Sequence, residues 1–371
     1  MELIKFFSKK YQKELMEVNF IIVQHLLNDT MELITDLLAN KIQIIGVVIK
    51  SYSCDEKNVD LLSKMKIPHV YVSQDSNEND TNYFNYLNIA KKDYEKNNRK
   101  TVILDLGGEF CNVLSQPGDY SYIKAIVEDT AFGHRKYLAN LSNIFVPIFS
   151  VAESHCKELE ARFVGRTIVN STEDILRTIG ETLYARNVLV FGYGMIGKNV
   201  AAGLKAFGCK VAVCEKDSVR RVDAYFDGFD VYEKYPLKPN LFIIGTTGSQ
   251  VLNFSNKDDI QNNLVLVSGS SKNIEFNIEQ IKKYADKVDV INQYIKNYYI
   301  DGKRVTVIND GFPVNFINKS IPDKIIDLLF AEMIQSIIQV DSFYELHKIN
   351  IVNKERINEI INKFFENSLV N

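Results

Sequence analysis

The sequence predicts an α/β protein with two domains, one of which contains a Rossmann-type, doubly wound parallel sheet. The first observation is length, because 371 residues can form two domains with separate cores. The second is that apolar runs of strand length alternate with helical patterns along most of the chain. The third is one segment in which an apolar run, 188–191, is followed by Gly192, Gly194 and Gly197, a helical pattern and a second apolar run, 211–214. Strand, glycine turn, helix and strand in this order are typical of a sheet that binds a dinucleotide.

The composition excludes several classes of partner. The net charge of -3 gives no electrostatic reason to expect nucleic acid or an anionic membrane as a partner. No apolar stretch reaches the length of a membrane span, and the first apolar run is too short for a signal peptide. The five cysteines include no Cys-x-x-Cys pair, which favours reduced thiols. We therefore expect a cytoplasmic protein that acts on a small molecule.

The N-terminal part of the chain predicts the first α/β domain. Its alternating pattern implies parallel strands joined by right-handed crossovers. We expect a helix from about 16 to 38, where leucines and methionine recur at helical spacing. The other expected elements are strands at 42–49, 68–72, 101–105 and 144–148, a helix at 58–65, a loop at 73–82 followed by a tyrosine-bearing helix to about 96, and a helix containing Lys157.

We expect residues 166–340 to form the second domain, which binds NAD. Residues 1–165 and 341–371 together are expected to form the first domain, which binds the substrate. The Asp301-Gly302 pair is typical of a tight hairpin turn between two strands. The other elements expected here are a helix at about 166–186, buried strands at 241–245 and 264–267, and a long helix from Pro322.

The spacing of the glycine segment indicates a role for each glycine. Gly192 makes the tight turn, Gly194 lets backbone N–H groups approach a pyrophosphate, and Gly197 lets the helix pack closely on the sheet. Glu215 ends the second strand, where a carboxylate accepts hydrogen bonds from the ribose hydroxyls and repels a 2′-phosphate. This arrangement favours NAD over NADP.

Small polar residues at two further strand ends extend the predicted cofactor site. A doubly wound sheet places the carboxyl ends of its strands along the crevice that binds the ligand. The residues predicted from these patterns to bind the cofactor are Gly192, Gly194, Met195, Ile196, Gly197, Glu215, Thr246, Thr247, Gly248, Ser268 and Gly269.

These segments resemble the S-adenosylhomocysteine hydrolase (adenosylhomocysteinase) family, and the resemblance covers most of the chain. The stretch from Phe191 to Asp217 and the Gly245-Thr-Thr-Gly248 segment are similar to the family's NAD site. Val314-Asn-Phe316 resembles its Leu-Val-Asn-Leu segment, which implies that Asn315 also binds NAD.

The first domain resembles the same family. Residues 104–109 resemble its Leu-Asp-Asp-Gly-Gly-Asp segment, and Glu128-Asp-Thr130 resembles its Glu-Glu-Thr, which implies Thr130 as a further NAD contact. Residues 151–157 resemble the segment with the family's catalytic lysine, and residues 24–53 align without a gap with the segment of its first active-site histidine.

The resemblance implies a chemistry. In the family, NAD oxidises the ribose 3′-hydroxyl, a base removes the acidified C4′ proton, the 5′-thiol leaves, water adds and the hydride returns. A site of this kind needs a base of tuned pKa and polar partners around the ribose. Carried over by position, Lys157 is the family's lysine, Asp129 its second acidic residue and His25 its histidine, and these three are the catalytic candidates.

Several positions depart from the family pattern. The second Asp of the glycine-pair segment is Leu106, and the aspartate and asparagine after the lysine are Ala161 and Arg162. The histidine of an Ile-Gly-His segment is Ser270, and residues 318–322 replace the Gly-His-Pro-Ser segment that binds adenosine. The family's C-terminal Lys- and Tyr-containing tail is also missing. The NAD contacts are thus largely kept while the substrate site is rebuilt.

Each candidate also has a simpler interpretation. Lys157 could be a solvated helix lysine, His25 a core histidine, and Asp129 a turn residue paired with Thr130. Arg220 and Arg221 could bind a 2′-phosphate, although a solvated helix face fits better beside Glu215. No metal site is expected, because His134, His155, Cys111 and Cys156 lack the spacing of metal ligands.

The leading functional hypothesis is an NAD-dependent enzyme of altered substrate specificity that transfers hydride at a secondary alcohol of a nucleoside-like or small polar substrate. Retained hydrolysis of S-adenosylhomocysteine and a catalytically silent NAD-binding regulator or partner are the alternatives. An ordinary 2-hydroxy-acid dehydrogenase ranks last, because the expected arrangement of Arg, Glu and His is missing. A homo-oligomer, dimer or tetramer, is compatible with the sequence.

Overall fold

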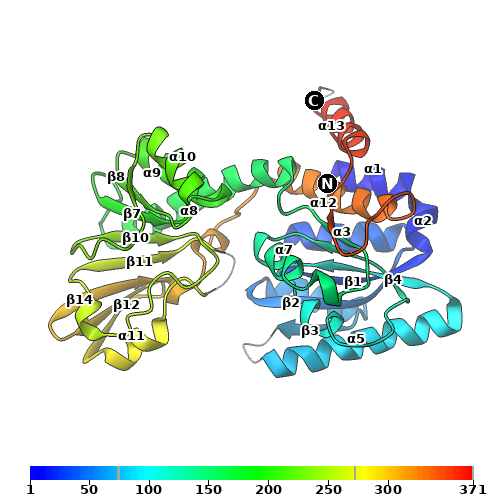
Figure 1. Cartoon of the computed structure of the whole chain (residues 1–371), viewed down its shortest axis with the longest axis horizontal. Helices are drawn as coiled ribbons and strands as arrows, with labels where there is room; N and C mark the ends of the chain where they lie inside the picture. The colour runs from blue at the N-terminus through cyan, green and yellow to red at the C-terminus, as the bar shows by residue number, and fades with distance from the viewer. Residues whose placement is uncertain (73–75, 271–272, 370–371) are drawn as a thin grey trace. The chain divides into compact units, whose positions relative to one another are not determined.

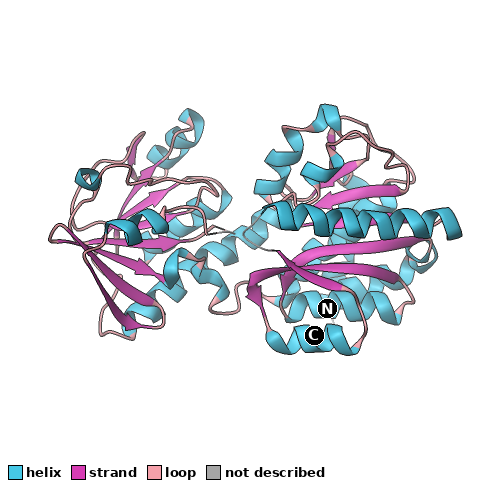
Figure 2. Cartoon of the chain, turned by 90° about the horizontal axis from the view of Figure 1, so that it is seen from below, coloured by secondary structure: helices cyan, strands magenta, loops and turns pink. Residues whose placement is uncertain are grey.

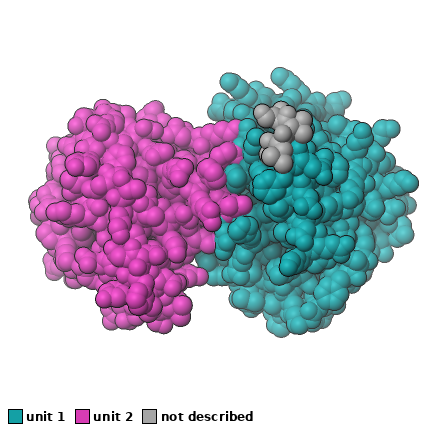
Figure 3. Space-filling model, turned by 90° about the horizontal axis from the view of Figure 1, so that it is seen from above, with its two compact units in different colours: residues 1–158, 323–371 teal, residues 159–322 magenta. Residues whose placement is uncertain are grey.

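The computed structural model describes residues 1–72, 76–270 and 273–369, and the chain divides into two compact units (Figure 1, Figure 3). Unit 1 consists of Met1–Glu158 together with Asp323–Asn371, and unit 2 of Leu159–Pro322. Each unit contains one central sheet with its own core.

Unit 1 is built on a seven-stranded sheet of order β15-β6-β5-β4-β1-β2-β3, and its strands are parallel (Figure 2). Strand β1 lies inside the sheet between β4 and β2, and all but one of its nine residues are buried, because helices cover both faces of the sheet. The strands are β1 (Val18–Leu26), β2 (Gln43–Cys54), β3 (His69–Val72), β4 (Lys100–Asp105), β5 (Ile123–Glu128), β6 (Ile148–Ser150) and β15 (Ile349–Asn350).

The helices of unit 1 form layers on the two sides of this sheet. In Figure 1, α1, α3 and α12 lie above the sheet and α5 lies below it. Tyrosines of α5 pack with apolar residues of β1, β2 and β4 in one core. The helices are α1 (Glu2–Lys10), α2 (Gln12–Met16), α3 (Asn28–Ala39), α4 (Glu56–Lys64), α5 (Ser76–Asn97), α6 (Cys111–Leu114), α7 (Ala131–Leu138), α12 (Asp323–Gln339) and α13 (Lys354–Leu369), and η1 (Leu141–Asn143) is a short 3-10 helix.

Unit 2 has an eight-stranded sheet of order β12-β13-β14-β11-β10-β7-β8-β9. The strands from β14 to β9 are parallel, and β12 and β13 add an antiparallel edge. The strands are β7 (Asn187–Phe191), β8 (Lys210–Cys214), β9 (Asp230–Tyr232), β10 (Phe242–Gly245), β11 (Leu264–Ser268), β12 (Lys287–Asn292), β13 (Ile295–Ile300) and β14 (Lys303–Ile308).

The helices of unit 2 include the long α8, which begins in unit 1 and continues into unit 2. They are α8 (His155–Arg177), α9 (Met195–Ala206), α10 (Ser218–Phe226) and α11 (Ile278–Tyr284), with 3-10 helices η2 (Lys257–Asp259), η3 (Asn309–Gly311) and η4 (Val314–Phe316). Two sheets built mainly of parallel strands, with helices between the strands, confirm the predicted fold class, a Rossmann-type domain plus a second α/β domain.

Side-chain caps explain where several helices begin. A short polar side chain before the first turn accepts a hydrogen bond from a backbone N–H that has no partner within the helix. Asp55 caps α4 in this way, Thr130 caps α7, Asp217 caps α10 and Asn277 caps α11.

The prediction of a helix at 16–38 is wrong in its first half. Residues Val18–Leu26 form the interior strand β1, and only Asn28–Ala39 form a helix. A strand buried on both faces is a continuous apolar run, which periodicity alone cannot distinguish from a buried helix. Strand β5 is also buried along most of its length, and the sequence patterns do not predict it.

The observed unit boundaries fall earlier than the predicted ones at 166 and 340. Helix α12 belongs to unit 1, where Asp327 accepts backbone hydrogen bonds from Leu3 and Ile4 of α1 at 2.8 and 2.9 Å. An apolar pattern shows that a helix is buried but not against which sheet it packs, so the sequence pattern groups α12 with its neighbour in the chain.

Other element bounds differ by a few residues. Helix α8 covers His155–Arg177 instead of 166–186, and β6 covers Ile148–Ser150 instead of 144–148. Of the loop expected at 73–82, residues 73–75 lie outside the described residues and α5 begins at Ser76. The predicted hairpin at Asp301-Gly302 is confirmed by the antiparallel pairing of β13 with β14.

Candidate functional site

The glycine turn of unit 2 joins β7 to α9. Gly192 has a positive φ of 90°, and a β-carbon on Gly197 would lie 2.1 Å from the Gly192 carbonyl oxygen, so this approach requires glycine. Gly194 is the N-cap residue of α9 and makes no side-chain cap. A β-carbon there would meet only the Arg220 guanidinium, at 3.6 Å. The space beside Gly194 and the N-terminus of α9 therefore suit a phosphate.

Glu215 follows β8 and connects the strand to the glycine turn. Its Oε2 accepts a hydrogen bond from the Tyr193 N–H at 2.6 Å, and its Oε1 accepts one from the Asp217 N–H at 2.9 Å. Each carboxylate oxygen can accept a second hydrogen bond, so these contacts leave capacity for hydroxyl donors. Arg221 donates to the Glu215 carbonyl oxygen at 3.0 Å and faces Glu233, which gives it a structural role.

The loop after β10 is held by a glutamate that the sequence patterns do not single out. The Thr247 hydroxyl and the Gly248 N–H donate to the Glu275 carboxyl group at 2.9 and 2.6 Å. Glu275 is completely buried, and this burial raises its pKa to about 7. Thr246 donates to the Phe191 carbonyl oxygen at 2.7 Å and so ties this loop to the glycine turn.

The end of β11 and Asn315 complete the polar groups of unit 2. The Gly269 N–H donates to the Gly245 carbonyl oxygen at 2.8 Å, and the hydroxyls of Ser268 and Ser270 lie 3.5 Å apart. Asn315 is buried, and within the described residues its Oδ1 has no hydrogen-bond partner. A buried amide oxygen without a donor is costly, so this group fits a ligand that supplies an N–H.

In unit 1, two buried carboxylates hold the glycine pair that follows β4. Glu128 accepts the N–H groups of Gly107 and Gly108 at 3.0 and 2.9 Å, and the hydroxyl of Thr130 at 2.7 Å. Asp105 accepts the next two N–H groups and the hydroxyl of Tyr137. The Thr130 hydroxyl also accepts the Gly133 N–H as the cap of α7, so it donates one hydrogen bond and accepts another within unit 1.

Two of the catalytic candidates, Lys157 and Asp129, form an ion pair. The Lys157 Nζ donates to the Asp129 Oδ1 at 2.9 Å, with 17% and 6% of the two side chains exposed. Asp129 follows β5. Lys157 lies in the first turn of α8, and its backbone N–H donates to the Ser154 hydroxyl at 3.2 Å. The start of α8 therefore presents an amine to a carboxylate at the end of a strand.

His25, the third candidate, lies at the end of β1 and is half-buried. Its Nδ1 is hydrogen-bonded to the Ser53 hydroxyl, and its ring meets the Tyr52 ring edge-on at 5.8 Å. Burial, with the positive charges of Lys50 and Lys157, lowers the pKa of His25 to about 3. The imidazole is therefore neutral at pH 7.

Lys50 is a charged group near His25 that the sequence patterns do not single out. It is buried and forms an ion pair with Glu109, whose other oxygen accepts the Tyr83 hydroxyl at 2.7 Å. A lysine inside an apolar strand gives no recognisable spacing, so only the fold shows this pair.

The departures from the family pattern are well-packed residues. Leu106 and Ala161 are 3% and 4% exposed, and Leu106 belongs to the core beneath α5. Ser270 is also buried, whereas Arg162 is exposed. Asn318 donates to Ser171 and Asp174 at 3.2 and 3.1 Å. Apolar side chains at the first two positions can neither orient a hydroxyl nor move a proton.

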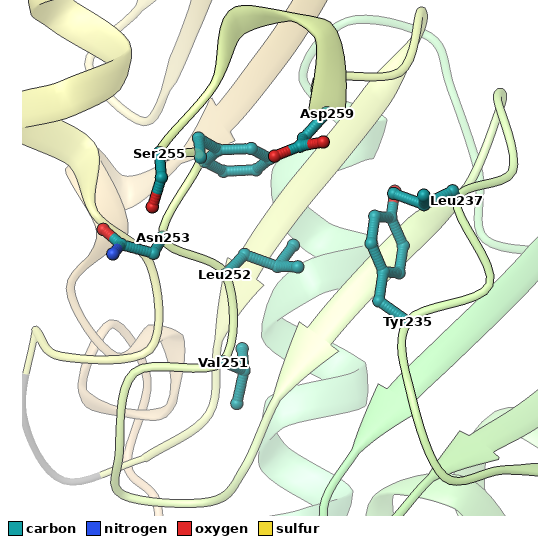
Figure 4. A pocket seen from close by; sticks show the side chains of 8 residues that line it. Tyr235, Leu237, Val251, Leu252, Asn253, Ser255 and Asp259 are labelled. Atoms are coloured by element: carbon teal, nitrogen blue, oxygen red, sulfur yellow. The ribbon is translucent and has the colours of Figure 1, made fainter.

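A separate hollow of about 210 Å³ lies in unit 2, on the segments that flank β10 (Figure 4). Tyr235 and Leu252 face one another across it, and the Tyr235 hydroxyl has no partner within the described residues. None of the residues predicted to bind the cofactor lines this hollow. Its lining residues are Tyr235, Leu237, Val251, Leu252, Asn253, Phe254, Ser255 and Asp259.

Two further kinds of site are absent from the described part of the chain. It contains no group of three or more His, Cys, Asp or Glu side chains arranged to hold a metal ion. None of its helices is both long and apolar enough to cross a membrane.

Comparison with known proteins agrees with the geometry of unit 2. Residues 167–321 match the S-adenosyl-L-homocysteine hydrolase NAD binding domain family. Adenosylhomocysteinase of Saccharolobus solfataricus is 24% identical over 329 residues, which cover 87% of this chain and 77% of that protein. Adenosylhomocysteinase of Pyrobaculum aerophilum is 27% identical over 230 residues, which cover 60% of this chain and 52% of that protein.

Among solved structures, a dipicolinate synthase chain of Bacillus halodurans is similar with a TM-score of 0.47 and 12% identity, over 87% of this chain and 99% of that one. The family match and the glycine turn together confirm NAD as the cofactor of unit 2.

Proposed function

We propose that this chain, which is similar to adenosylhomocysteinases, is an NAD-dependent enzyme with an altered substrate. It would transfer hydride, transiently or in net, at a secondary alcohol of a nucleoside-like or other small polar molecule. The observation that carries this proposal is the Lys157–Asp129 ion pair of unit 1. Two positions that are polar in the resembled family are apolar here, Leu106 in the same unit and Ala161 on the part of α8 that belongs to unit 2.

Unit 2 supplies the groups that would hold NAD. The open space at Gly194 and the N-terminus of α9 suit the pyrophosphate, the Glu215 carboxylate suits ribose hydroxyls, and the Asn315 Oδ1 suits the carboxamide N–H. Bound NAD supplies a hydride acceptor, which is the part of the chemistry that no side chain can perform.

Unit 1 supplies the groups that would handle the proton and orient the substrate. Asp129 holds the Lys157 amine in place, and this amine can take up or release a proton at its Nζ. His25 is neutral at pH 7, so it serves as a hydrogen-bonding group whose orientation the Ser53 hydroxyl fixes. Lys157, Asp129 and His25 are therefore the proposed catalytic residues.

The altered substrate specificity rests on which polar groups are missing. Leu106 replaces a carboxylate that, in the family, belongs to the substrate site, and it is 3% exposed. The buried Lys50, which is paired with Glu109, brings a positive charge close to His25. Loss of several cooperating groups usually abolishes a reaction, so we expect a different substrate.

The test is to load the purified protein with NAD, add adenosine, S-adenosylhomocysteine and small secondary alcohols in turn, and follow the absorbance of reduced nicotinamide. We expect at least one alcohol to reduce the cofactor in the wild type and none in Lys157→Met. The proposal would be contradicted if the protein binds NAD but none of these compounds reduces it.

Retained hydrolysis is the alternative that a specific observation favours, because Lys157, Asp129 and His25 keep the family's positions and lie in one unit. Release of homocysteine from S-adenosylhomocysteine would establish it. NAD binding with neither reduction nor release would instead favour a silent NAD-binding protein. A cytoplasmic location and a homo-oligomeric state, dimer or tetramer, also belong to the proposal, and sedimentation measures the latter.

A further inference from the structure

Glu332 is an acidic residue in the middle of the most apolar helix of unit 1. Helix α12 is buried along nearly its whole length, and Glu332 is 2% exposed. A carboxylate in such surroundings is costly unless polar groups face it. The partners of Glu332 therefore indicate why it is there.

Two side chains that are hydrogen-bonded to the Glu332 carboxyl group lie where α8 begins, Ser154 just before its first residue and Cys156 in its first turn. The Ser154 hydroxyl donates to the Glu332 Oε2 at 2.7 Å, and the Cys156 thiol is also hydrogen-bonded to this carboxyl group. The same Ser154 hydroxyl accepts the Lys157 N–H at 3.2 Å. Glu332 is thus connected to the backbone of Lys157 through one hydroxyl.

The charged groups that act on Glu332 are those of the proposed catalytic pair. Burial and the negative charge of Asp129 raise the pKa of Glu332 to about 6, while Ser154, Cys156 and the positive charge of Lys157 oppose that shift. Above about pH 7, Glu332 is therefore mainly a carboxylate, and its charge acts on the Lys157 amine.

We propose that Glu332 is a positioning residue for Lys157: it anchors the first turn of α8, and its negative charge, added to that of Asp129, keeps the Lys157 amine protonated. The inference deepens the proposed function, because it assigns a control to the residue that would handle the proton there. It stands on contacts within unit 1 alone.

The experiment measures how fast the Lys157 amine reacts with a trace of acetic anhydride, by mass spectrometry, from neutral to alkaline pH. Only an unprotonated amine reacts. In Glu332→Gln, which keeps an acceptor for Ser154 but loses the charge, we expect Lys157 to react about three to ten times faster at mildly alkaline pH, the effect of removing one nearby charge. Glu332→Asp, which keeps the charge, should return the rate towards that of the wild type.

Asp327→Asn is the matched control, because Asp327 is a buried carboxylate on the same helix that binds the N–H groups of Leu3 and Ile4 instead of α8. This variant should lose stability without changing the reactivity of Lys157. Equal reactivity of Lys157 in the wild type and folded Glu332→Gln, or an equal change in Asp327→Asn, would overturn the proposal.

A reciprocal measurement covers the case in which Glu332→Gln does not fold. Coupling between two charges is mutual, so Lys157→Met should raise the pH at which the infrared band of the protonated Glu332 carboxyl group disappears. No change in that titration would contradict the proposal. Neither measurement uses a substrate, so a failure of the hydride-transfer proposal would leave both results interpretable.

Discussion

The two units stabilise a glycine-containing loop in the same way. In each unit the loop follows the carboxyl end of a parallel strand, and a completely buried glutamate accepts hydrogen bonds from its backbone N–H groups. In unit 2, Glu275 accepts the Gly248 N–H, and in unit 1, Glu128 accepts the N–H groups of Gly107 and Gly108.

The units differ in what these loops present. Unit 2 keeps open space at Gly194 and a buried amide oxygen at Asn315 that lacks a partner within the described residues. In unit 1, Leu106 packs into the core, and the neighbouring Glu109 is paired with Lys50. The difference teaches that the scaffold of a loop can persist while the groups that meet the ligand change. This is the physical basis for proposing a kept cofactor and a different substrate.

Among the changes considered, Gly197→Ala should disturb the glycine turn of unit 2 most severely. The new methyl group would lie 2.1 Å from the Gly192 carbonyl oxygen, so the turn must move. We expect unit 2 to lose about 3 kcal/mol of unfolding free energy and the protein to lose NAD binding. Denaturant unfolding and calorimetric titration with NAD measure the two effects.

Gly194→Ala is the matched control for this change. Its methyl group would approach only the end of the Arg220 side chain, at 3.6 Å, so stability should change little while NAD binding weakens. Equal loss of stability in the two variants would refute the role assigned to Gly197.

The buried glutamate of unit 2 gives a pH test of this shared arrangement. The folded-state pKa of Glu275, about 7, lies above the unfolded value of 4.5, so its contribution to stability is full below pH 4.5 and is lost as the pH rises through 7. Wild type should lose about 3 kcal/mol over this range from Glu275 alone. Glu275→Gln should remove this loss.

Thermal unfolding across the pH range measures the effect, with Glu279→Gln as the control, because Glu279 is exposed in the adjacent helix. A pH dependence that is the same in Glu275→Gln and in the wild type would show that Glu275 does not titrate in this range.

His25 gives the opposite pH dependence in unit 1. Its folded-state pKa of about 3 lies below the unfolded value of 6.5, so stability present above pH 6.5 is lost as the pH falls towards 3. Near pH 4.5 the loss should be about 3 kcal/mol in the wild type and absent in His25→Asn. His155→Asn, at an exposed position, should behave as the wild type does. If His25→Asn and the wild type lose stability equally on acidification, the lowered pKa of His25 is disproved.

The smallest effect compares a buried ion pair with an exposed one in the same unit. Asp129→Asn removes the carboxylate that is ion-paired with the partly buried Lys157 amine, and we expect a loss of about 1–2 kcal/mol of unfolding free energy. Asp341→Asn breaks the Lys124–Asp341 pair, in which the Asp341 side chain is 54% exposed, and should cost less than about 0.5 kcal/mol. Urea unfolding measures both, and equal losses would show that Lys157 is solvated.

Much of the fold was predictable because short-range patterns determine it. The β7–α9–β8 segment combines a strand, three glycines at fixed spacing and an amphipathic helix, and each of these is visible within about thirty residues. Strand β1 was missed because an uninterrupted apolar run has no period that distinguishes strand from helix. The unit to which α12 belongs was missed because this depends on packing between distant segments.

The residues of the candidate site were predictable to the same extent: those in short motifs were, and those that depend on tertiary packing were not. The resemblance of short segments predicts Lys157, Asp129 and His25 as catalytic candidates, and the fold brings the first two into contact. Glu275 and Glu332 could not be identified, because a lone glutamate in a loop or an apolar helix has no motif. Only the tertiary structure shows which hydroxyls and N–H groups they accept.

The most direct test of the central claim is a calorimetric titration of NAD into the purified wild-type chain. We predict one NAD bound per chain, with much weaker binding of NADP because the Glu215 carboxylate would face the 2′-phosphate. No binding of NAD, or equal binding of NAD and NADP, would contradict the account of unit 2 on which the proposed chemistry depends.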